Sequence, residues 1–113
     1  MEVRIHGKHM NVSADLRQMA ADKVGRAARV FEGADFADVE FTEEQNPRIS
    51  AERCRVEITA HAAGQVVRVE AADFDPRAAL DLAADKFERQ LRKHKGRLIA
   101  RHRRGSDKHL NGT

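Results

Sequence analysis

The sequence predicts a single α+β domain with the element order β-α-β-β-β-α, in which two helices pack on one face of a four-stranded sheet. Two patterns carry this prediction. Four segments alternate apolar and polar residues, as in a strand with one buried face. Two longer segments repeat apolar residues every three or four positions, as in an amphipathic helix. A chain of 113 residues is also long enough to bury the core of one domain.

A strand and a helix are expected in the first third of the chain. Residues 2–6 alternate between apolar and polar side chains. Ser13 is the expected N-cap of a helix over residues 14–31, because its hydroxyl can accept a hydrogen bond from a free backbone amide of the first turn. Gly33 is placed to end this helix. Gly25 lies within the helix, where it is either simply tolerated or allows close approach to a partner. The apolar stripe consists of Leu16, Ala20, Val24, Ala27 and Phe31.

Three further strands are expected at residues 36–43, 51–61 and 66–72. Asn46-Pro47 marks the turn after the first of them, and a short connection containing a glycine separates the last two. Strands joined in this way form an antiparallel meander. Their apolar side chains share one face, so we expect both helices there. The Arg, Glu and Thr side chains of the opposite face then meet water.

The last helix carries most of the positive charge. It begins at Asp75, a good N-cap, with Pro76 at the first helical position, where the missing N–H costs nothing. Its apolar face is formed by Leu80, Ala83, Ala84, Phe87 and Leu91. Residues 86–104 hold nine Lys or Arg and a single acid, a net charge of +8, against +3 for the whole chain. The rest of the chain is therefore net acidic, and the charge is strongly asymmetric.

The end of this helix is open to two interpretations. Gly96 either ends it or interrupts a pattern that continues through Leu98 and Ile99. We divide the chain into a domain of residues 1–96 and a basic, flexible tail of residues 97–113. The last part of this tail consists mostly of small and polar residues.

Each helix carries a row of cations beside its apolar face. The first row is Lys23, Arg26 and Arg29, and the second is Lys86, Arg89, Lys93 and Arg97. Helices packed side by side would bring the two rows together into one patch that can bind phosphate through charge-assisted hydrogen bonds. The chain has no Trp or Tyr, and its five Phe mostly fit the core pattern. Without exposed aromatics for base stacking, we expect recognition of folded RNA or DNA by shape and phosphate, with a solvated charged face as the alternative.

Motifs for catalysis and cofactor binding are missing from the sequence. It contains no GxSxG, P-loop, GxGxxG, HExxH or CxxC motif, so we expect no enzymatic activity and no cofactor. The six histidines lack the grouping of a metal site, and His94 and His102 lie among cations. Cys54 falls on the apolar side of its strand, where a thiol is inert. A single cysteine and the lack of a long apolar run fit a cytoplasmic protein without an internal disulfide or a membrane span.

Two segments resemble one known family. Residues 85–97, DKFERQLRKHKGR, are similar to the second-helix signature of the ribosome hibernation promoting factor family, which includes the ribosome-associated inhibitor and is also called sigma-54 modulation protein. Residues 5–13, IHGKHMNVS, resemble that family's first strand and the start of its first helix. The similarity covers about residues 1–100, and the family has the same β-α-β-β-β-α order.

The resemblance implies a ribosome hibernation factor. Family members bind the small ribosomal subunit in the cleft between head and body, overlap the mRNA path and the tRNA A and P sites, and silence translation in stationary phase or under stress. Residues 1–96 would then be the ribosome-binding domain, with the small subunit and its rRNA as partner and with no membrane or small-molecule substrate. Carried over by motif, the rRNA-binding residues are Lys23, Arg26, Arg29, Lys86, Arg89, Gln90, Lys93 and Arg97.

The resemblance leaves alternatives open. Long family members add a C-terminal domain that dimerises ribosomes, so this chain is either a short member or the N-terminal part of a long one. Self-association is expected only through such a domain, which this chain does not contain. The older family name suggests a different function, a protein-interaction module that modulates a transcription factor. A small enzyme using Asp and His residues of the sheet has no motif to support it.

Overall fold

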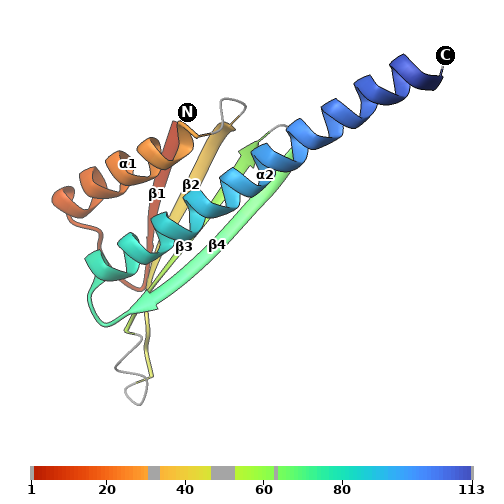
Figure 1. The fold of residues 1–113 in the computed structure, drawn as a ribbon. Coiled ribbons are helices and arrows are strands. Elements are labelled where there is room, and N and C mark those ends of the chain that lie inside the picture. Colours follow the sequence, from red (N-terminus) through yellow and green to blue (C-terminus); the bar gives the residue numbers. More distant parts are fainter. Residues whose placement is uncertain (1, 31–33, 47–52, 63, 113) are drawn as a thin grey trace.

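The computed structural model confirms the predicted element order (Figure 1). The structure describes residues 2–30, 34–46, 53–62 and 64–112, although not the side chains of residues 34, 62 and 97–112. The elements are β1 (Glu2–Lys8), α1 (Ala14–Ala28), β2 (Ala34–Glu43), β3 (Cys54–Ala62), β4 (Gln65–Asp73) and α2 (Pro76–Gly112).

The four strands form one mixed sheet in the order β1-β2-β3-β4. Strands β2, β3 and β4 are the predicted antiparallel meander, whereas β1 pairs with β2 in parallel. A parallel pair needs a crossover connection over one face of the sheet, and α1 supplies it. Helix α2 packs on β3 and β4 beside α1, so both helices cover the same face, as predicted (Figure 1).

The core lies between this face of the sheet and the two helices. Among the described residues, no polar or charged residue is buried. Burying an apolar side chain of this size stabilises the fold by about 1.5–3 kcal/mol. The largest fully buried side chains are Phe41, Phe87, Ile58, Leu80, Leu91, Val24, Val39 and Val56.

Both helices begin where the sequence predicts. The Leu16 N–H donates to the Ser13 hydroxyl at 3.1 Å, and the Arg77 N–H donates to the Asp75 carboxylate at 3.1 Å. Helix α1 ends at Ala28, three residues earlier than predicted, because the amides of Arg29 and Val30 bond three residues back in a tighter last turn. Phe31 and Gly33, and the first two residues of the predicted third strand, lie outside the described residues.

Helix α2 continues past Gly96 to Gly112. A single glycine costs a helix only about 1 kcal/mol relative to alanine, and the neighbours Lys95 and Arg97 are good helix formers. The division that we drew at residue 96 therefore falls inside a helix. The flexibility of residues 97–113 stays a prediction.

The turn between β1 and α1 requires a glycine at position 7. A Cβ atom on Gly7 would lie 2.3 Å from the Met10 carbonyl oxygen and 3.1 Å from a methyl carbon of Val12. Within the same turn, His9 adopts a positive φ of 59°, so the chain folds back tightly over the end of β1. This close approach fixes how α1 leaves the sheet.

We expect Gly7→Ala to lower the free energy of unfolding by about 1–3 kcal/mol, because the added methyl group must push the turn away from β1. Gly25→Ala is the matched control, since a Cβ there would meet nothing within 4 Å. Removing this glycine from a helix interior should raise the free energy of unfolding by about 0.5–1 kcal/mol. Urea unfolding followed by circular dichroism measures both changes. Equal effects of the two substitutions would show that the turn adjusts freely.

Candidate nucleic-acid interface

Two cations of α1, Lys23 and Arg26, lie on the side of the helix that faces α2. The Lys23 ammonium is 2.5 Å from the carboxylate of Asp81 on α2, and the Lys23 side chain is only 30% exposed. Arg26 is exposed and donates from Nε to the backbone carbonyl of Asp22 at 3.3 Å. Arg29 is exposed at the C-cap of α1. Of these three, Lys23 is therefore already occupied by an ion pair.

On α2, Lys86 points toward strand β4, whereas Arg92 lies 3.8 Å from Glu88, which lines the groove with α1. The Lys86 ammonium donates to the backbone carbonyl of Glu70 on β4 at 3.0 Å. Lys93 lies seven residues, or about two turns, further along and is exposed on the same flank. Arg89 is exposed, and its Nε reaches only a backbone carbonyl of its own helix at 3.5 Å. Gln90 is half-buried on the same flank.

Acidic side chains occupy the space between the two rows. A groove of about 250 Å³ runs between α1 and α2 and is lined by Lys23, Arg26, Ala27, Asp81, Ala84, Asp85 and Glu88. The predicted merging of the two basic rows in one patch is therefore wrong. Residues 81 and 86 differ by five positions, which is about 140° around a helix, so one faces α1 when the other faces β4. The side chain of Arg97 lies outside the described residues.

Sequence reasoning missed these acids, although the signal was present. Asp81, Asp85 and Glu88 recur at steps of four and three, so they share one flank of α2 by the rule that we applied to the cations. What the sequence alone does not provide is the rotation of α2 about its axis, which decides whether acids or cations face α1.

The open face of the sheet carries Arg and Glu side chains, as predicted, and these pair with one another. Arg55 lies 3.2 Å from Glu70 and Arg68 lies 3.9 Å from Glu57. The expectation that the Phe residues are mostly core needs correction. Phe36 is half-buried on this open face, with its ring stacked on His61 at 4.6 Å between centroids and under the Arg4 guanidinium at 4.4 Å. Phe74 is 58% exposed.

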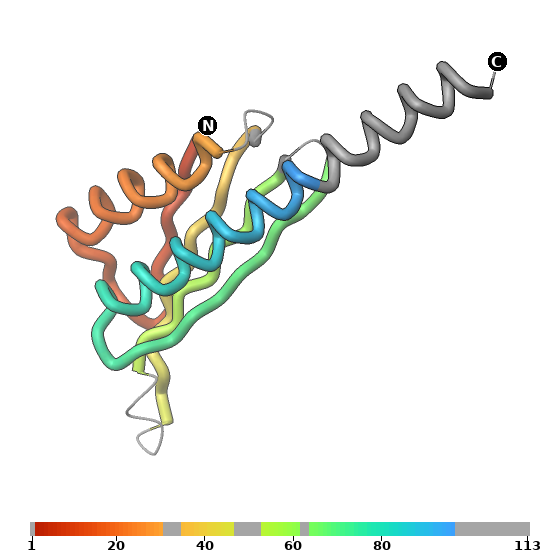
Figure 2. Tube along the Cα trace, in the orientation of Figure 1, coloured from red at the N-terminus to blue at the C-terminus, as the bar shows by residue number. Residues whose placement is uncertain are grey.

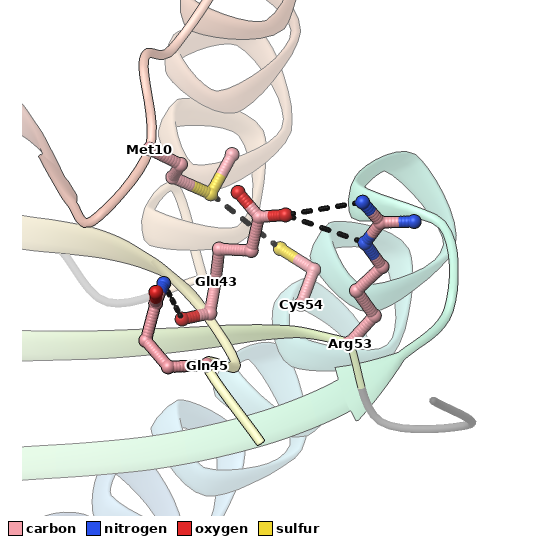
Figure 3. A network of polar contacts seen from close by, with 5 residues as sticks. All are labelled: Met10, Glu43, Gln45, Arg53 and Cys54. Atoms are coloured by element: carbon pink, nitrogen blue, oxygen red, sulfur yellow. Dashed lines mark hydrogen bonds and ion pairs between the residues drawn. The ribbon is translucent and has the colours of Figure 1, made fainter. Parts of the chain in front are cut away.

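The single cysteine lies at one end of the sheet, where Figure 3 shows its surroundings. Cys54 is buried, and its sulfur is 4.0 Å from the Met10 sulfur. Glu43 accepts from two nitrogens of Arg53 at 3.3 Å each (Figure 3). Burial raises the pKa of the Cys54 thiol, and the negative charges of Glu43 and Asp75 raise this pKa further. A thiol held neutral in this way is a poor nucleophile.

In the part of the chain that the structure describes, no group of three or more His, Cys, Asp or Glu side chains is arranged to hold a metal ion. Within the same residues, no helix combines the length and the apolar character needed to cross a membrane.

Comparisons with known proteins point to one family. Residues 3–99 match the sequence profile of the family described as sigma 54 modulation protein / S30EA ribosomal protein. The chain is 36% identical over 101 residues to the ribosome hibernation promoting factor of Azotobacter vinelandii, covering 89% of each protein. It is 33% identical over 112 residues to the ribosome hibernation promotion factor of Bacillus subtilis, covering 97% of this chain but only 57% of that relative.

A solved structure shares the fold. The N-terminal domain of Thermus thermophilus Protein Y superposes with a TM-score of 0.70 at 26% sequence identity, covering 83% of this chain and 99% of that one. The chain thus spans most of one curated relative and little more than half of another.

The raised pKa of Cys54 has a measurable consequence. Because the pKa of the Cys54 thiol is raised, a smaller fraction is thiolate at about pH 8 than in the urea-unfolded chain, and the folded protein should react with iodoacetamide at least about tenfold more slowly. The difference should narrow as the pH rises through the raised pKa. Mass spectrometry measures the rate, and Cys54 is the only cysteine that can react. Equal rates in the folded and unfolded chains would contradict the burial of this thiol.

Proposed function

Because the chain belongs to the family described as sigma 54 modulation protein / S30EA ribosomal protein, we propose that it is a ribosome hibernation factor. It binds the small ribosomal subunit near the decoding region, blocks the mRNA and tRNA sites, and inhibits translation under stress or in stationary phase. It does so by occupying space, with no catalytic step and no cofactor. The protein acts in the cytoplasm, where its partner is found.

The observation that carries this proposal is the set of exposed cations on the outer surface of the helical layer. Rows of this kind suit a polyanion, because Lys and Arg replace condensed counterions along a phosphate backbone. The proposed rRNA-binding residues are Lys23, Arg26, Arg29, Lys86, Arg89, Gln90, Lys93 and Arg97.

These residues are not equally ready to bind. Arg89 and Lys93 are exposed, and neither forms an ion pair within the described residues. Lys86 can leave its bond to the Glu70 carbonyl without stranding an opposite charge. Lys23 would have to give up Asp81, so it contributes least. Arg97 is proposed on the resemblance alone.

We expect Arg89→Glu combined with Lys93→Glu to weaken co-sedimentation with small ribosomal subunits by at least about a hundredfold, since each lost charge-assisted contact costs about 1.5–3 kcal/mol. The same variant should lose inhibition of translation in vitro. Binding of the wild type should fall steeply with salt, by about 0.7–0.9 in log K per log salt for each phosphate contact. The variant's slope should be smaller by about 1–2.

Lys8→Glu combined with Arg77→Glu is the matched control, because it changes the net charge equally at exposed positions away from both rows. It should bind almost as well as the wild type. Equal losses in both variants would show that total charge, and not this surface, governs binding. A complex with a non-ribosomal protein that survives nuclease treatment would favour the protein-interaction module instead.

A further inference from the structure

Both outer strands of the sheet have a backbone carbonyl that is covered by a cation from the overlying helix. Strand β4 is the last strand in the sheet order, and Figure 2 shows it as the outermost strand, with α2 running along it. The Lys86 ammonium of α2 donates to the Glu70 carbonyl of β4 at 3.0 Å. At the other edge, the Arg17 guanidinium of α1 donates to the Ile5 carbonyl of β1 at 3.1 Å. The same contact at both edges indicates a common role, because the unpaired backbone groups of an edge strand can pair with another chain.

The register of the β3–β4 hairpin shows which backbone groups of β4 face outward. Ala62 pairs with Gln65, and a two-residue connection joins them. Such a connection closes with a hydrogen-bonded pair. Backbone groups alternate in direction along a strand, so the odd-numbered residues of β4 bond to β3, and the even-numbered residues direct their N–H and C=O groups outward. Glu70 belongs to the outward set, which agrees with the bond from Lys86. Within the described residues, no strand pairs with this side of β4.

The outward side of β4 is complementary to a second copy of itself. In antiparallel pairing about a two-fold axis at Val69, Arg68 of each copy lies opposite Glu70 of the other. Val66 then meets Ala72, so the other outward residues are apolar. Moving the axis by one residue along the strand places Arg68 or Glu70 opposite its own copy, and like charges directly opposite are destabilising. The Arg68 and Glu70 side chains are 67% and 54% exposed, so both can reach a second copy. Charge therefore favours the axis at Val69 over its neighbours.

Lys86 occupies the position that the second copy needs. In the favoured register, the Glu70 carbonyl would accept from the Arg68 N–H of the other copy, but this carbonyl already accepts from the Lys86 ammonium. Two-fold symmetry also brings a Lys86 ammonium from each copy to the same short stretch of the ladder, where the two charges repel each other. We propose that the β4 edge is a pairing surface for a second copy of this chain and that Lys86 keeps this edge closed. The chain then remains single unless Lys86 is withdrawn, in keeping with the expectation that self-association needs a further domain.

The test measures self-association of the full chain by sedimentation equilibrium, without ribosomes or RNA, so its result is independent of the proposed function. Lys86→Ala should dimerise at least about tenfold more tightly than the wild type, because the freed Glu70 carbonyl of each copy can enter the ladder. Lys86 is exposed and alanine is the best helix former, so α2 is retained in this variant. The matched control is Lys95→Ala, which removes the same charge from another exposed position of α2 and should self-associate as the wild type does.

Charge reversals in the Lys86→Ala background test the register. Adding Arg68→Glu places acids opposite each other, and adding Glu70→Arg places cations opposite each other, so each of these variants alone should lose the gain in dimerisation. An equal mixture of the two should recover the gain as a mixed dimer, because each acid then meets a cation of the other copy. No gain in Lys86→Ala, an equal gain in Lys95→Ala, or no recovery in the mixture would overturn the inference.

Discussion

The packing of two helices on a single face of the sheet is the constraint on which the rest of the structure depends. It follows from the parallel pairing of β1 with β2, because the crossover helix α1 must cover one face. Helix α2 then buries Phe87 and Leu91 beside it. Since the described core contains no polar residue, the charges of these elements lie on the surface, including the open sheet face, the groove between the helices and the outer side of α2.

The three surfaces differ in how their charged side chains are paired, and we infer their roles from this difference. On the open face, arginines and glutamates of neighbouring strands neutralise one another, as Arg55 and Glu70 do at 3.2 Å. The groove between the helices contains both acids and cations, and Asp81 forms an ion pair with Lys23. The outer side of α2 offers cations, such as Lys93, that form no ion pair within the described residues. The positive charge that is in excess in the sequence is thus concentrated on one flank of α2.

The fold was predictable from sequence because each element carries its own local signals. Alternation identified the strands, and Ser13 and Asp75 marked the helix starts that their hydrogen bonds confirm. The arrangement of the candidate site was less predictable, because the relation of Lys86 to Lys23 depends on how α2 is rotated against α1, which is a matter of tertiary packing. The expectation that the Phe residues are mostly core overlooked that Phe36 stands out of phase with Val39 and Phe41 in the alternation of β2.

The same rotation couples the core to the surface. Leu80, Phe87 and Leu91 fix which side of α2 faces the sheet, and at about 100° per residue they thereby fix which sides present acids and cations. Inserting one residue before Phe87 would turn the following part of α2 by that angle, so that either the core contacts or the charged flanks lose their positions. The interface therefore cannot shift around the helix without breaking the core. A pattern of buried side chains that looks purely structural therefore also fixes the positions of the cations Lys86 and Lys93 and of the acids that line the groove.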